Sequence, residues 1–148
     1  QAGVVVELIV RGICCLRPGL PGVSDNIRVR SIIGRFLEHS RISYFENATE
    51  PEVYCASADW MDRNFFVRVE TWFPIQDATL AKQVVKEGLT PYLNDNTQAW
   101  LMAADGSYER VKPGSAKPRS AQLTLLEELD KRKPVKPLMG PRRKRTTK

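Results

Sequence analysis

The only histidine of the chain, His39, lies two residues before Arg41, and a Ser-x-Asp group follows further on at Ser57 and Asp59. If the strands next to these groups pair, His39, Arg41 and Asp59 come together at one end of a sheet. The histidine would then move a proton or accept phosphorus, the cation would neutralise phosphate oxygens, and the carboxylate would orient the ring. A single histidine is more often a structural residue than a functional one, so the pattern alone leaves a purely structural role for His39 open.

A second candidate is Arg11, which ends a predicted strand and is followed by Gly12. Ligands collect at the carboxyl ends of strands in α/β sheets, and glycine lets them approach the backbone. A structural ion pair with Glu7 or another neighbour is the alternative. The first eight basic residues of the chain are all arginines, whose planar fork binds phosphate oxygens in pairs: positions 11, 17, 28, 30, 35, 41, 63 and 68.

Metal and disulfide chemistry are not expected. Asp59 and Asp62 are only an ordinary acidic pair, and one histidine with three cysteines, two of them adjacent, makes neither a zinc site nor a disulfide framework. No apolar run approaches the roughly 20 residues of a membrane helix, and no signal peptide is visible. We expect a cytoplasmic protein, with peripheral membrane association left open.

The elements that must position these residues alternate between strand and helix patterns. Residues 4–10 predict a buried, central strand, and residues 27–33 and 67–75 predict two more. Residues 42–45 and 53–56 predict a hairpin, and residues 35–39 a helical turn. Residues 60–64 are expected in a loop, with Trp60 and Met61 in the core.

Helix and turn signals follow in the second half of the chain. Asp77 is a candidate N-cap for a helix that reaches Tyr92, and Ser120 for a last helix over residues 120–132. Asp105-Gly106 predicts a hairpin between residues 98–102 and 108–111. We therefore predict an α/β domain, with α+β as the alternative, around one mixed sheet.

The net charge of +6 conceals two unlike parts. Residues 1–109 contain 10 basic and 14 acidic residues (−4), whereas residues 110–148 contain 13 basic and 3 acidic residues (+10) and five of the ten prolines. We predict a domain over residues 1–111 and a basic Pro/Lys/Arg-rich tail over 112–148. Such a tail is usually solvated, and docking on a polyanion is the alternative.

Three stretches together resemble a known family. They are VRGICCLRPG at residues 10–19, SDNIRVRSIIGRFLEHSR at residues 24–41, and SADWMDRN at residues 57–64 with RVE following at 68–70. They are similar to the last, phospholipase-D-like catalytic domain of bacterial polyphosphate kinases, and the resemblance runs from about Val6 to Val111. It implies a phospholipase-D-like mixed sheet flanked by helices, in a fragment of a longer enzyme.

The resemblance also implies an activity. The family reversibly transfers the terminal phosphate of ATP to polyphosphate through a phosphohistidine in a preceding domain, which this chain lacks, so the chain alone is expected to be inactive. ATP or ADP and polyphosphate would be the substrates, with Mg²⁺ arriving as Mg–ATP. The preceding domains of the same enzyme would be partners, the full-length form a homo-oligomer, and nucleic acid is not an expected partner.

Site residues follow from the same resemblance. His39 matches the family's second active-site histidine, which assists proton transfer or steadies the phosphohistidine, and Arg11 matches a phosphate-binding arginine. Arg41 adds positive charge for phosphate, and Ser57 and Asp59 match a supporting Ser-x-Asn pair. Arg41, Glu46 and Asp59 stand where phospholipase D enzymes have Lys, Asp and Asn, which argues against a free-standing phosphodiesterase.

Two other functions remain open from the sequence. One is a non-catalytic module that binds a polyanion, polyphosphate or nucleic acid, through its arginines and basic tail. The other is a phospholipase-D-like nuclease in which two copies of the chain pair their His39 side chains.

Overall fold

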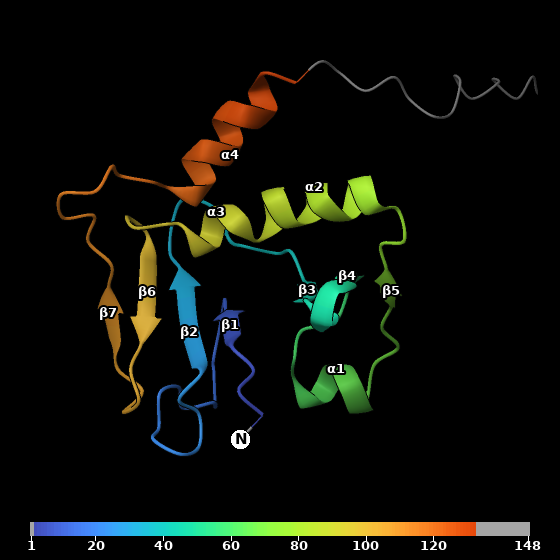
Figure 1. Ribbon diagram of the computed structural model, residues 1–148, viewed down its shortest axis with the longest axis horizontal. Helices are drawn as coiled ribbons and strands as arrows, with labels where there is room; N and C mark the ends of the chain where they lie inside the picture. The colour runs from blue at the N-terminus through green and yellow to red at the C-terminus, as the bar shows by residue number, and fades with distance from the viewer. Residues whose placement is uncertain (1, 133–148) are drawn as a thin grey trace, which may run out of the picture.

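The computed structural model describes residues 2–132 of the chain, which form two sheets and their flanking helices (Figure 1). The first sheet has the order β1 (Val6–Ile9), β2 (Ile27–Ile32), β6 (Ala99–Met102), β7 (Tyr108–Arg110). The second has the order β3 (Ile42–Phe45), β4 (Glu52–Ala56), β5 (Trp72–Pro74). The helices are α1 (Asp62–Phe66), α2 (Ala78–Gly88), α3 (Thr90–Leu93) and α4 (Ala121–Asp130), with a short turn η1 at Asn47–Thr49.

The predicted mixed α/β class is confirmed, but the strands divide between two sheets where one was expected. In the first sheet β1 runs parallel to β2, and the other pairs are antiparallel. The second sheet is antiparallel throughout. Figure 1 shows the two sheets side by side, with α2 and α3 running across one end of both and α4 beyond them.

The core of the first sheet lies under β2 and β6 rather than under β1. Val29 and Ala99 are almost completely buried, whereas Val4 and Val5 are exposed and precede the strand. The prediction of a buried, central first strand is wrong, because β1 is an edge strand with one neighbour and its residues are only half-buried. A β-branched run favours extended structure but does not say how many strands flank it.

The second sheet contains the predicted hairpin, in which Ile42 pairs with Cys55 and Phe45 with Glu52. The predicted strand over residues 67–75 is shorter, because residues 67–71 form a turn and an irregular segment after α1 and only Trp72–Pro74 pair as β5. The amide of Arg68 donates to the carbonyl of Arg63 (3.0 Å) in this turn. The helical turn expected over residues 35–39 is wrong, and this segment is an irregular loop.

The helix caps follow the sequence signals. Asp77 Oδ1 accepts a hydrogen bond from the amide of Leu80 (2.8 Å) at the start of α2, and Ser120 Oγ accepts one from the amide of Leu123 (3.4 Å) at the start of α4. The single helix predicted up to Tyr92 is two helices. Pro91 lies in the first turn of α3, where its missing N–H costs least.

One buried carboxylate ties α4 to the first sheet. Asp95 Oδ1 accepts from the amides of Thr97 (2.8 Å), Gln98 (2.6 Å) and Ala99 (3.2 Å), and its Oδ2 accepts from the amide of Ala121 (2.7 Å). The same side chain therefore shapes the entry to β6 and satisfies an amide in the first turn of α4.

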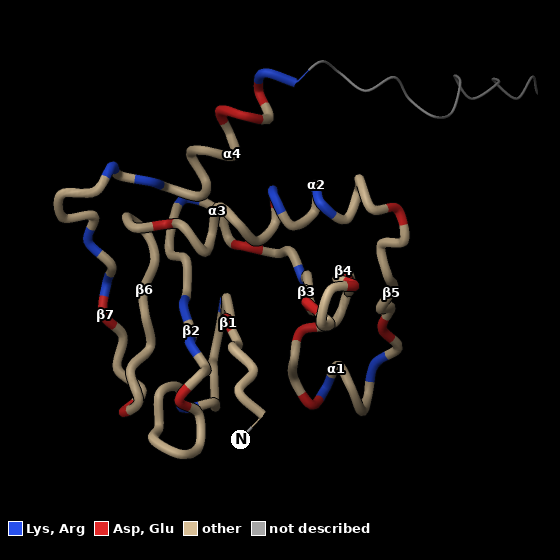
Figure 2. Tube along the Cα trace, viewed as in Figure 1, with Lys and Arg blue, Asp and Glu red and all other residues tan. Residues whose placement is uncertain are grey.

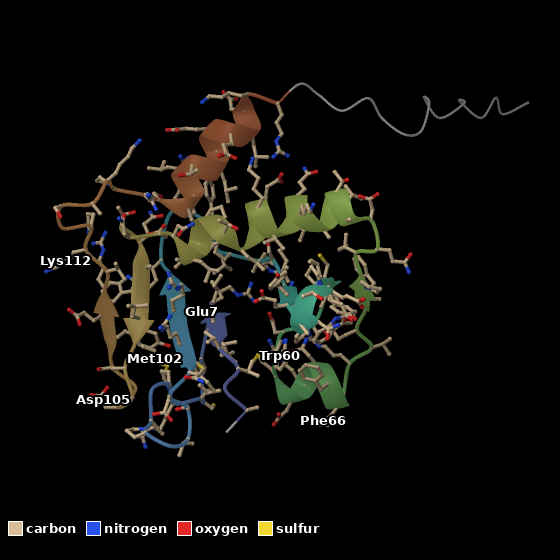
Figure 3. All side chains as sticks on the ribbon, in the orientation of Figure 1. Glu7, Trp60, Phe66, Met102, Asp105 and Lys112 are labelled. Atoms are coloured by element: carbon tan, nitrogen blue, oxygen red, sulfur yellow. The ribbon has the colours of Figure 1, made fainter. Side chains whose placement is uncertain are left out.

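The second sheet and α1 carry an exposed apolar surface. Trp60 is 75% exposed, and its ring lies edge to face with Phe65 (5.9 Å between centroids) and tilted against Trp72 (6.0 Å). Figure 3 shows Trp60 and Phe66 on opposite sides of α1. Placing Trp60 and Met61 in the core is therefore wrong, and the predicted loop at residues 60–64 includes the first three residues of α1.

Basic residues gather after β7, where Figure 2 shows successive Lys and Arg positions leading to α4. The end of the chain, with its PRRKR run, lies outside the described residues. No helix between residues 2 and 132 combines the length and hydropathy needed to cross a membrane.

Candidate functional site

Asp59 lies between two arginines from different parts of the chain. Arg11 Nη2 donates to both oxygens of Asp59 (3.3 Å each), and Arg41 Nε donates to Asp59 Oδ1 (3.0 Å). The three side chains are each between 23% and 30% exposed, so the cluster is partly shielded but still open to solvent. The structure thus brings together three of the predicted site residues, separated by up to 48 positions.

His39 joins this cluster through Arg41. Arg41 Nη1 lies 3.0 Å from His39 Nδ1 and also donates to the His39 carbonyl (3.2 Å), while Arg11 Nη1 donates to the Glu38 carbonyl (3.0 Å). The alternative of an ion pair between Arg11 and Glu7 is wrong, because Arg11 pairs with Asp59 and Glu7 pairs with Arg28 (2.9 Å) and Arg30 (3.8 Å). An ion pair with another neighbour does occur, since Asp59 is that partner.

Backbone pairing delivers the two arginines to the same place. The amide of Val10 donates to the Arg30 carbonyl (2.8 Å), which extends β1 toward Arg11, and the amide of Ala56 donates to the Arg41 carbonyl (3.0 Å), which extends the β3–β4 ladder. Arg11 therefore leaves the end of the first sheet, and Arg41 precedes the first strand of the second sheet. Asp59 follows β4 by three residues and reaches both.

The loop before His39 is fixed by α4. Gln122, which is buried, accepts from the amide of Phe36 (3.1 Å) and donates to the Phe36 carbonyl (2.8 Å) and to Glu38 Oε1 (2.6 Å). A Cβ at Gly34 would overlap the Gln122 side-chain amide, so a larger residue here would displace Gln122 from these bonds. Sequence analysis assigned no role to Gln122, because a single glutamine in a helix carries no recognisable signal.

Ser57 belongs to a neighbouring cluster rather than to the Asp59 cluster. Its hydroxyl donates to Glu70 Oε2 and accepts from the amide of Thr71 (3.0 Å), and Asn64 Nδ2 donates to Glu70 Oε1 (2.6 Å). These bonds, that of Ser57 first, lower the pKa of Glu70, with a smaller contribution from the charges of Arg68 and Arg41. Glu70 and Asn64 lie inside the motifs quoted above, but the sequence suggested no role for either.

The pKa of Asp59 is lowered, first by its hydrogen bond from Arg41 and then by the charges of Arg41, Arg11 and Arg63, against a smaller opposing effect of burial. Asp59 is therefore ionised at neutral pH. Together with Arg11 and Arg41 it forms a group of formal charge +1, which is suited to attract an anion while keeping both guanidinium groups in place.

This shift predicts a pH dependence of stability. A carboxylate whose folded pKa is depressed stabilises the fold above its unfolded pKa of about 3.9, and this contribution is lost as pH falls through the folded value. Asp59→Asn is therefore expected to lower the free energy of unfolding at pH 7, and the difference from the unsubstituted chain should shrink as pH falls from about 4 toward 2. Urea unfolding across this range measures it. Asp130→Asn, at an exposed position of α4, is the matched control, and a difference that does not vary with pH would refute the assignment.

A hollow of about 460 Å³ adjoins the site on the side of the helices. His39 and Arg41 line one part of it, with Cys55, Tyr92 and Leu129 further along. Burial raises the pKa of the Cys55 thiol and, together with Glu38, that of Tyr92, so both side chains stay protonated at neutral pH. Neither is suited to act as a nucleophile.

The described residues do not form a protein-held metal site. No group of three or more His, Cys, Asp or Glu side chains gathers within residues 2–132, and the one carboxylate of the cluster, Asp59, already accepts hydrogen bonds from two arginines. Mg²⁺ needs carboxylate or phosphate oxygens that are free to coordinate it.

Comparison with known proteins identifies similar chains. Residues 1–122 match the family described as Polyphosphate kinase C-terminal domain 2. The chain is 62% identical over 130 residues to a polyphosphate kinase of Pseudomonas aeruginosa, covering 87% of this chain and 19% of that protein. It is 57% identical over 126 residues to one of Paraburkholderia phytofirmans, covering 85% and 18%.

A solved structure is similar as well. The crystal structure of a polyphosphate kinase from Porphyromonas gingivalis superposes with a TM-score of 0.81 at 41% identity, over 86% of this chain and 19% of that one. The chain thus spans about a fifth of the length of the relatives that it matches.

Proposed function

Because the chain belongs to the polyphosphate kinase C-terminal domain 2 family, we propose that it forms one half of the active site of a polyphosphate kinase. The reaction is the reversible transfer of the terminal phosphate of ATP to polyphosphate. The observation that carries the proposal is the sharing of Asp59 by Arg11 and Arg41 directly beside His39.

Arg11 is the proposed phosphate ligand. A guanidinium has five N–H donors, and Arg11 contacts three acceptors: the Glu38 carbonyl and the two oxygens of Asp59. The remaining donors can bind phosphate oxygens, while Asp59 keeps the fork from turning away. Phosphoryl transfer depends mainly on such alignment and neutralisation of oxygens. In this proposal Mg²⁺ arrives with ATP as Mg–ATP.

His39 is the proposed proton donor or hydrogen-bond donor to the transferring group. His39 is exposed, and its Nδ1 atom contacts Arg41, which leaves Nε2 as the ring nitrogen proposed to face a substrate. The phosphohistidine of the reaction belongs, in this proposal, to a preceding domain of the same enzyme, in the cytoplasm where ATP is available. The exposed apolar surface formed by Trp60, Phe65 and Trp72 supports contact with further domains or subunits, including those of a homo-oligomer.

Labelling with γ-phosphate-labelled ATP and Mg²⁺ tests the proposal. The 148-residue chain alone is expected to acquire no acid-labile phosphate at His39. A complete kinase that carries this chain is expected to acquire acid-labile phosphate on a histidine of a preceding domain. It should still do so when His39 is replaced by alanine, because the acceptor is not His39.

Two results would contradict the proposal. One is acid-labile label on His39 itself. The other is a complete protein that binds polyphosphate without forming any phosphoenzyme, which would favour a polyanion-binding module.

A further inference from the structure

The contact between Arg41 and His39 determines which imidazole nitrogen carries a proton. A guanidinium can only donate hydrogen bonds, so at 3.0 Å from Arg41 Nη1 the Nδ1 atom of His39 must accept with its lone pair. In a neutral imidazole one nitrogen accepts and the other carries the hydrogen. The proton of neutral His39 is therefore on Nε2.

Arg41 is held in place independently of the His39 ring. Its Nε donates to Asp59 Oδ1 (3.0 Å), and its backbone carbonyl accepts from the amide of Ala56 (3.0 Å) at the start of the β3–β4 ladder. Nη1 also donates to the His39 carbonyl (3.2 Å), which restricts the side chain from the other end. With only 23% of its side chain exposed, Arg41 presents Nη1 to the imidazole from an anchored guanidinium.

We propose that Arg41 is a positioning residue that holds His39 as the Nε2–H tautomer, so that His39 presents an N–H donor, and not a lone pair, to a phosphoryl group. The donation to a phosphoryl group rests on the proposed function, whereas the tautomer rests only on the contact between Arg41 and His39. Attack on phosphorus requires a lone pair on the attacking nitrogen. In this tautomer the only imidazole lone pair is on Nδ1, where Arg41 covers it.

The arrangement assigns His39 the role of donor rather than phosphate carrier. An Nε2–H group can donate a hydrogen bond to an oxygen of the transferring phosphoryl group. It does so without a bond between nitrogen and phosphorus. Asp59 acts one step further away, because it orients Arg41 rather than the ring itself.

Nitrogen-15 NMR of the 148-residue chain tests the tautomer directly, because the chain has a single histidine and hence one pair of ring-nitrogen signals. At a pH where the ring is neutral, we expect Nδ1 to resonate as an unprotonated nitrogen and Nε2 as a protonated one. A protonated Nδ1 in the unsubstituted chain would overturn the inference, and this measurement needs no variant to fold.

Three variants identify Arg41 as the cause. Arg41→Met keeps a long side chain but removes every donor, so we expect a mixture of the two tautomers. Arg41→Lys keeps a donor and should restore most of the Nε2–H form. Arg28→Met, at an exposed arginine that pairs with Glu7, is the matched control and should leave the ring signals unchanged. An unchanged tautomer in Arg41→Met would overturn the inference.

Activity of the complete kinase separates this inference from the proposed function. Arg41→Met is expected to slow phosphate transfer about 10- to 100-fold, with partial recovery in Arg41→Lys, on the scale of a misplaced catalytic group. If His39→Ala proves fully active, the proposed function fails. The tautomer is then still decided by the nitrogen-15 spectrum. If His39→Ala is inactive but Arg41→Met retains full activity, the positioning role fails alone.

Discussion

Replacing His39 with alanine in a complete polyphosphate kinase that carries this chain is expected to slow phosphate transfer about 100-fold or more, the usual loss when a proton-transferring group is removed. The reason is that no other side chain of the cluster can donate a proton: Arg11 and Arg41 stay charged, and Asp59 is held ionised by both. Steady-state transfer from ATP to polyphosphate measures the effect, and phosphoenzyme formation, followed separately, should persist.

The neighbouring Ser40→Ala is the matched control for this variant, because Ser40 lies in the same loop. It should keep a near-normal rate. His39→Gln, whose amide can donate a hydrogen bond but cannot transfer a proton, distinguishes the two possible roles of the ring. Recovery of activity in His39→Gln supports a hydrogen-bond donor, and a loss equal to that of alanine supports proton transfer. Near-normal turnover of His39→Ala would refute the assignment altogether.

Replacing Arg11 with alanine is expected to cost about 100-fold or more in the same assay, comparable to the loss of an electrostatic group at a transition state. Arg11→Lys should recover only part of the lost activity. An ammonium keeps the charge but not the planar fork, which binds the two Asp59 oxygens and the Glu38 carbonyl at once. The rate at saturating ATP and polyphosphate separates loss of transition-state stabilisation from weaker binding.

Arg28→Ala is the control for Arg11→Ala, since Arg28 is an exposed arginine whose partner, Glu7, lies on β1. It should leave the rate nearly unchanged. We expect Arg11→Ala to fold, because Asp59 keeps Arg41 as an ion-pair partner among the described residues. Circular dichroism and thermal unfolding measure whether it does. Full activity of Arg11→Ala would show that phosphate is bound by other groups.

Local signals in the sequence predicted much of the fold. The β3–β4 hairpin, the Asp105-Gly106 turn and the caps at Asp77 and Ser120 each depend on residues within a few positions of one another. The errors concern neighbours that are distant in sequence. Whether β1 is central or at an edge, and whether the strands form one sheet or two, depends on pairings that local patterns do not contain.

The candidate site divides in the same way. Histidine, arginine and Ser-x-Asp patterns selected Arg11, His39, Arg41 and Asp59, and the structure gathers these four side chains; their functional roles stay predictions. The carbonyl of Glu38 could not be selected, because every residue has one. The separation of Ser57 from Asp59 was also out of reach, because residues two apart can turn toward different partners once a strand has ended.

The contacts of Gln122 bear on where this domain ends. The family match stops at residue 122, in the first turn of α4, and the division predicted from charge places a boundary even earlier, after residue 111. Yet Gln122 and Ala121 hold the loop before His39 and the buried Asp95. A gene fragment cut at residue 111 would lose both contacts, and one cut at 122 would keep them on a helix too short to form. For expression of this domain, we therefore propose a boundary beyond Asp130, past residue 122 where the family match stops.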